Sequence, residues 1–155
     1  MDAKEDAQPR SFEEALDLVQ SSPTLRKIKA HIDNSNLSAD LKAILYDVAK
    51  ISVKIGETVV ALGRRVFVIA SALVEKFPNL TIGTLVGLVV ATVVGGTVGA
   101  IPILGATLAA ILSKLIVILG VGKGFIDDLR NNAAKAEMDR VAQQFDVLGL
   151  GMARP

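Results

Sequence analysis

The chain of 155 residues contains no cysteine, no tryptophan and a single histidine, and aromatic side chains occupy only 4% of its positions. The absence of cysteine excludes a disulfide framework and thiolate chemistry. With His31 as the only histidine, a histidine-based metal cluster or catalytic triad is also excluded. The formal net charge of +1 gives no reason to expect nucleic acid as a partner. We therefore expect that the protein is not an enzyme and that it has no catalytic residue, no metal site and no cofactor.

One glycine-rich segment, Gly120–Gly124, resembles a phosphate-binding loop only superficially. It lacks the G-x-x-x-x-G-K-[ST] spacing, and neither serine nor threonine follows Lys123. We interpret the segment as the end of a helix. Asp127 and Asp128 then start the next predicted helix, where carboxylates complement the helix dipole. We do not interpret them as a catalytic pair.

Charge is nearly absent from one long stretch, Leu80–Val121, whose only charged residue is Lys114. The middle of the stretch, Gly99–Pro102, has the glycine and proline expected of a turn. About 20 residues remain on each side, and a helix of ~20 residues matches the ~30 Å hydrocarbon core of a bilayer. The stretch therefore has the length and composition of a helical hairpin that crosses a membrane twice, or of the buried middle of a helical bundle.

We predict that the arms of this hairpin are residues 80–100 and 103–121, with Ile101 and Pro102 at the tip. The tip carries no charge, whereas basic residues flank the hairpin on both sides. An inserted hairpin would keep both flanks on one side of the membrane and pass its tip across.

Helix-start signals precede the stretch. Ser11 and Glu14 have the spacing of a capping box. Ser22 followed by Pro23 predicts a second helix with proline at its first position. These signals predict two short helices before residue 34.

Ser38 caps the longest amphipathic pattern, in which apolar residues recur every three or four positions. We interpret this pattern as one long helix that ends at Phe77, because the following Pro78 disfavours helix for the residue before it. Gly56 and Gly63 favour a bend or break within it, since glycine is a poor helix former.

Together these patterns predict an all-α fold in which amphipathic helices surround a central hydrophobic helical hairpin. After the hairpin we predict a last amphipathic helix from about Phe125 to Phe145. We predict one domain with four parts: a disordered tail at 1–10, an amphipathic helical region at 11–79, the hairpin at 80–122, and the C-terminal helix and tail at 123–155.

Small residues form regular rows on both arms of the hairpin. Four glycines in register along one helix are unfavourable unless a second helix approaches closely, as small residues allow in membranes. We therefore predict that the rows serve helix packing and pore formation, within one molecule or between copies. Their members are Gly83, Gly87, Ala91, Gly95 and Gly99 on the first arm, and Gly105, Ala109 and Ser113 on the second.

The few polar side chains of the hairpin allow two interpretations. Thr81, Thr84 and Thr92 lie near one another, and their hydroxyls either bond back to the helix carbonyls or face water. Lys114 either reaches the membrane interface, or belongs to an arm that never enters lipid, or faces a water-filled lumen. In the last case these four residues line the conduit.

An apolar hairpin surrounded by amphipathic helices resembles the pore-forming domains of colicins. The glycine row and the small size resemble more closely the small pore-forming effectors of the bacterial type VI secretion system. That resemblance implies insertion into the inner membrane of a rival cell, assembly into a homo-oligomer in the lipid bilayer, and ion leakage. It also implies a secretion-tube protein that shields the hairpin and an immunity protein in the producing cell.

Three functions remain open at this point: a pore-forming antibacterial toxin, a resident membrane hairpin protein of the holin-like or phage-delivered kind, and a soluble helical interaction module. The first residues lack a basic segment followed by an apolar core, so we expect no cleaved secretory signal. A toxin of this kind would leave its cell by a route that needs no such signal. A resident protein would stay in the inner membrane.

Overall fold

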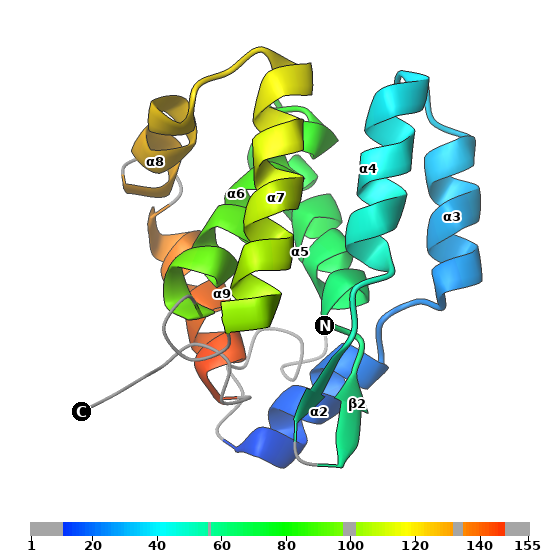
Figure 1. Ribbon diagram of the computed structural model, residues 1–155, viewed down its shortest axis with the longest axis vertical. Coiled ribbons are helices and arrows are strands. Elements are labelled where there is room, and N and C mark those ends of the chain that lie inside the picture. The colour runs from blue at the N-terminus through cyan, green and yellow to red at the C-terminus, as the bar shows by residue number, and fades with distance from the viewer. Residues whose placement is uncertain (1–10, 56, 98–101, 132–134, 148–155) are drawn as a thin grey trace.

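The computed structural model describes residues 11–55, 57–97, 102–131 and 135–147 (Figure 1). The described part of the chain is 76% helical, which confirms the predicted all-α class. Within the described residues the elements are α2 (Phe12–Gln20), α3 (Leu25–Asp33), α4 (Ala39–Ala49), β1 (Val53–Ile55), β2 (Thr58–Val60), α5 (Leu62–Lys76), α6 (Ile82–Thr97), α7 (Pro102–Leu119), α8 (Lys123–Asn131) and α9 (Lys135–Val147). The predicted tail at residues 1–10 lies outside the described residues.

The first helices begin with side-chain caps. The Ser11 hydroxyl accepts a hydrogen bond from the Glu14 amide at 3.2 Å, as predicted. The prediction that Pro23 is the first residue of α3 is wrong. Thr24 is the N-cap, because its extended backbone lets its hydroxyl accept from the Lys27 amide at 3.3 Å. Helix α3 therefore starts two residues after Pro23.

The prediction of one long helix from Ser38 to Phe77 is also wrong. The start and the end are as expected, because Ser38 caps α4 and α5 ends one residue before Phe77. Between them the chain forms an antiparallel hairpin in which Val53 pairs with Val60. The alternation of apolar and polar residues from Ile51 to Ile55 has the period of a strand, and β-branched side chains favour that conformation.

Gly63 explains why α4 and α5 come so close after this hairpin. Its amide donates to the Ile51 carbonyl at 2.8 Å. A Cβ atom at position 63 would overlap the carbonyl oxygen of Val48 and lie 2.9 Å from the Ile51 backbone nitrogen. Only glycine allows this contact between the two backbones. The other glycine where a break was expected, Gly56, lies outside the described residues.

In the C-terminal region, where one helix was predicted from Phe125 to Phe145, the described residues form α8 and α9, and residues 132–134 between them lie outside the described residues. Asp127 lies in the second turn of α8, so the prediction that the aspartates start the helix is wrong by about one turn. The apolar stripe predicted for this region does face the core, because Met138, Val141 and Phe145 are buried.

Helix α6 lies at the centre of the molecule. It contacts α4, α5, α7, α8 and α9, and its residues from Gly83 to Val93 are all buried. Figure 1 shows α7 in front of it, with α4 and α3 on one side and α8 on the other. One uncharged helix therefore lies among the amphipathic helices α4, α5, α8 and α9 and the apolar helix α7, and this arrangement positions the candidate site.

The apolar hairpin as the candidate functional site

The candidate site is the pair α6 and α7, which pack against each other and carry the small-residue rows. Helix α6 has 16 residues and α7 has 18. Pro102, predicted at the tip, is the first residue of α7, whereas Ile101 and Gly99 lie outside the described residues. Gly95 and Gly105 lie within α6 and α7, respectively.

The two glycines near the start of α6 face neighbouring helices of the same molecule. A Cβ atom at Gly83 would lie 3.1 Å from Leu119 Cδ2 of α7 and 3.2 Å from Leu41 Cδ2 of α4. A Cβ atom at Gly87 would lie 3.3 Å from Ile126 Cδ1 of α8. In this conformation the row lets α4, α7 and α8 approach α6 closely.

The row continues at Ala91, which is buried and whose carbonyl accepts a hydrogen bond from Arg130 Nη1 at 3.3 Å. Arg130 thus ties α8 to the middle of α6. On α7, Ala109 is half-buried and Ser113 is exposed, and the Ser113 hydroxyl donates to the Ala109 carbonyl at 3.0 Å. This small-residue row of α7 turns partly toward the surface.

The hydroxyls of Thr81, Thr84 and Thr92 form hydrogen bonds with groups close to them in the sequence. Thr81 Oγ1 accepts from the Thr84 amide at 3.1 Å and lies 3.0 Å from Thr84 Oγ1. The buried Thr92 hydroxyl donates to the Leu88 carbonyl at 3.0 Å. Thr92 thus bonds back to a carbonyl of its own helix, whereas Thr81 is exposed just before α6 and caps the first turn of that helix.

The outer face of α7 borders a groove of about 490 Å³ that it forms with α4. Lys114 is exposed there and makes no ion pair within 4.0 Å to any residue of the described ranges. Val117 is 79% exposed, and Ile118 is also exposed. The groove is lined by Asp40, Ala43, Ile44 and Asp47 of α4 and by Ser113, Lys114, Val117 and Ile118 of α7.

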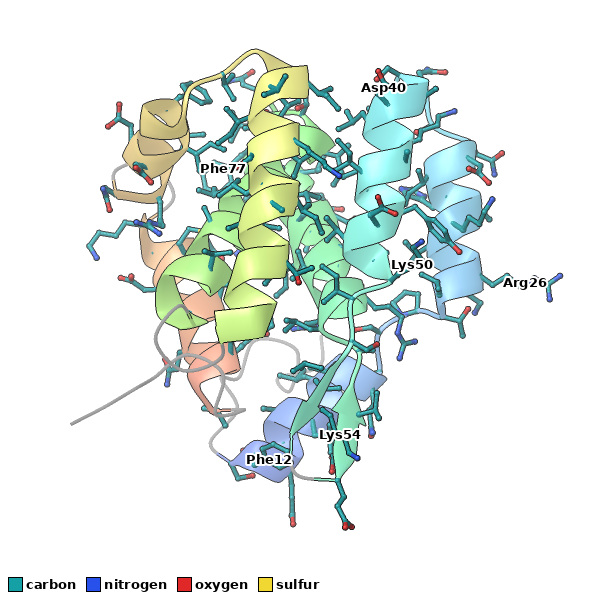
Figure 2. All side chains as sticks on the ribbon, viewed as in Figure 1. Phe12, Arg26, Asp40, Lys50, Lys54 and Phe77 are labelled. Atoms are coloured by element: carbon teal, nitrogen blue, oxygen red, sulfur yellow. The ribbon has the colours of Figure 1, made fainter. Side chains whose placement is uncertain are left out.

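Sequence reasoning missed Asp40 and Asp47 as members of this groove. The two aspartates are seven residues apart, so they lie on the same side of α4. Figure 2 shows Asp40 at the end of α4 beside which α7 finishes. The spacing alone could have placed them on one face, but only the packing of α4 against α7 brings them near Lys114.

Polar contacts between α5 and α9 tie together two helices that cover α6. Gln144 Oε1 accepts from Arg65 Nε at 3.2 Å and from Arg65 Nη2 at 3.0 Å. Burial lowers the pKa of the Arg65 guanidinium below its ordinary value. Lys76 Nζ pairs with the Glu137 carboxylate at 2.8 Å near the surface, where such a pair contributes about 0–1 kcal/mol.

The segment after α7 ends a helix, as predicted. Gly120 has a φ of 69°, and its amide donates to the Ile116 carbonyl at 3.1 Å. This left-handed conformation is the usual glycine stop signal. In the described part of the chain, no group of three or more His, Asp or Glu side chains has an arrangement that could hold a metal ion.

By length and composition, no single helix among the described residues qualifies as a membrane span. Two consecutive helical segments, Thr107–Leu119 and Gly124–Asn131, qualify only as a pair bent by 104°. Comparisons with protein-family models, curated proteins and solved structures found no match to this chain.

Proposed function

We propose that this protein is a pore-forming toxin that keeps α6 in the centre of a helical bundle, with α7 packed against it at the surface, and inserts this hairpin into a bilayer. The observation that carries the proposal is the position of α6. This helix has no charged side chain, yet it lies at the centre of the fold with amphipathic helices around it. Such an arrangement keeps an apolar helix out of water until a membrane offers an equivalent environment.

The exchange of environment is energetically feasible because lipid tails are about as apolar as the side chains that cover α6. The apolar area of α6 is therefore kept away from water both before and after insertion. The backbone groups of the two helices are hydrogen-bonded within each helix, which a bilayer requires.

The lengths of the two helices suit a thinned bilayer. At 1.5 Å per residue, α6 and α7 extend about 24 and 27 Å, against a hydrocarbon core of ~30 Å. A span that is shorter than the core is accommodated by local thinning or by oligomerisation. Assembly of several copies through the glycine row then gives the conduit, with the threonines and Lys114 along it.

The target in this proposal is the inner membrane of another bacterium, reached by a route that needs no secretory signal. A tube protein of the secretion machinery shields the hairpin in transit, and an immunity protein protects the producer. These partners follow from the resemblance to small secreted effectors.

Dye and ion leakage from anionic liposomes tests the proposal, with protein purified without detergent. We expect leakage that rises steeply with protein concentration, because several copies must assemble. As a matched control, the same protein is added to liposomes after heat denaturation and removal of aggregates. Protein that stays in solution and causes no leakage at any pH or lipid composition would contradict the proposal.

One observation favours a second function, that of a helical interaction module. Val117 and Ile118 of α7 are exposed beside a groove, as expected of a surface that binds another protein. The leakage measurement separates the two functions, because an interaction module leaves liposomes intact. A chain that cannot be obtained without detergent would instead be a resident membrane protein.

A further inference from the structure

The groove between α4 and α7 has the chemistry of a surface that recognises a copy of itself. Its α7 wall carries the protruding side chain of Val117 and the cation of Lys114, which makes no ion pair with any described residue. Its α4 wall carries the carboxylates of Asp40 and Asp47. The surface therefore has a projecting valine beside the groove, with a positive charge on the α7 wall and negative charges on the α4 wall.

We infer that a second copy of this chain docks in the α4–α7 groove and forms a two-fold symmetric dimer in solution. A two-fold axis that runs parallel to the groove places α7 of each copy over α4 of the other. Lys114 of each copy then faces the acidic wall of the second copy, and Val117 enters its groove. This dimer is separate from any assembly in a membrane, and it does not rest on the proposed function.

Small side chains on both walls allow the two copies to approach. Ala43 on α4 and Ser113 on α7 both line the groove, and neither projects far from its helix. Part of the lining is apolar, with Ile44 on the α4 wall and Ile118 on the α7 wall. Covering Val117 and Ile118, which are both exposed, removes apolar area from water, which is the main favourable term in association.

The charges of the groove favour the binding of a second copy over the binding of an anionic lipid surface. The two carboxylates of the lining outnumber its single cation, and of the two only Asp47 has a neighbouring cation within 4.0 Å among the described residues, Lys50 at 3.4 Å. Anionic headgroups would be repelled by the acidic wall. A second copy instead offers a lysine to each acidic wall and an acidic wall to each lysine.

Charge-reversal variants test this dimer by sedimentation equilibrium without detergent or lipid. One variant is Lys114→Glu, and the other combines Asp40→Lys with Asp47→Lys. We expect the wild-type chain to be a dimer at micromolar concentration. Each variant alone places like charges opposite each other in both halves of the interface, so we expect its dissociation constant to rise by more than about 100-fold.

An equimolar mixture of the two variants gives the sharper result. In a mixed dimer, Glu at position 114 of one chain faces the introduced lysines of the other chain. The native Lys114 of that second chain faces the native aspartates of the first. Both halves of the interface are therefore complementary, and we expect the mixture to regain dimers that neither variant forms alone.

The matched control is Lys27→Glu, which reverses an exposed lysine on α3 away from the groove. We expect this variant to dimerise as the wild type does, and circular dichroism to report native helix content in all variants. A monomeric wild type at the highest attainable concentration would overturn the inference. So would variants that dimerise as tightly as the wild type, a mixture that stays monomeric, or a monomer whose α7 face binds anionic vesicles.

Discussion

Replacing Gly63 by alanine is expected to destabilise the protein more than any other single-methyl addition in the described residues. The added Cβ would overlap the carbonyl oxygen of Val48, and it would lie 2.8 Å from the carbonyl carbon of the same residue. Backbone atoms cannot rotate away as a flexible side chain does, so α4 and α5 must separate. We expect a loss of about 3 kcal/mol or more in the free energy of unfolding, measured by urea denaturation.

Gly124→Ala is the matched control for this prediction. Gly124 lies in α8, is exposed, and has no atom within 4 Å of the position its Cβ would take. Because alanine is the better helix former, we expect this variant to gain up to about 1 kcal/mol. Equal stabilities of the two variants would show that α4 and α5 do not approach each other at Gly63.

The second large effect is expected from Gly87→Leu, which acts on both the stored bundle and the membrane assembly. In the bundle, the larger side chain meets Ile126 Cδ1, which would lie 3.3 Å from a Cβ at position 87, and then Leu112 of α7. We expect a loss of about 1–3 kcal/mol in the free energy of unfolding. In the membrane, the same side chain blocks close helix approach, so we expect leakage to fall by at least about tenfold.

Liposome flotation separates these two effects, because a loosened bundle still binds lipid. We expect Gly87→Leu to bind liposomes at least as well as the wild type while causing little leakage. Gly124→Leu supplies the comparison, since the position is exposed and open. Full leakage by the Gly87→Leu variant would contradict a role for the glycine row in the pore and leave it a role in the bundle alone.

The helical class and several helix ends could be predicted from local signals. Ser11 and Ser38 cap their helices, Pro78 follows the end of α5, and Gly120 stops α7. Such signals involve residues only a few positions apart, so they can be recognised in the sequence. Pro23 led to a wrong prediction of the start of α3, because Thr24 takes the N-cap position and forms the observed hydrogen bond.

The β hairpin could not be read from helical spacing alone. From Ile51 to Ile55, apolar residues that fit a helical stripe also fit the alternation of a strand. Whether the segment forms a helix or a strand depends on Gly63. Because this residue has no side chain, α5 can pack against α4, and that packing requires the chain to reverse its direction between the two helices. That contact joins residues far apart along the chain, and a local pattern does not encode it.

The residues of the candidate site could be predicted from the sequence, but the helices that cover each of its two arms could not. The stretch with a single charge marks α6 and α7, yet its composition does not reveal that α6 is buried from Gly83 to Val93 while α7 keeps Val117 at the surface. That difference arises because five helices contact α6, whereas α4 covers only one side of α7. The groove and its charges follow from this incomplete cover.

The most direct test of the account is whether leakage requires α7 to separate from α4. The chain has no cysteine, so Ala43→Cys with Val117→Cys gives one reactive site on each wall of the groove. A short, reducible bis-maleimide then links α4 to α7, and the product that has the mass of a single chain is purified. The control links Ser113→Cys to Val117→Cys, which applies the same chemistry within α7.

If the hairpin must leave its cover, the α4–α7 link abolishes liposome leakage and a reductant restores it, while the link within α7 leaves leakage unchanged. Leakage that is undiminished by the α4–α7 link would contradict the account, because the pore would then form without release of the hairpin from the bundle.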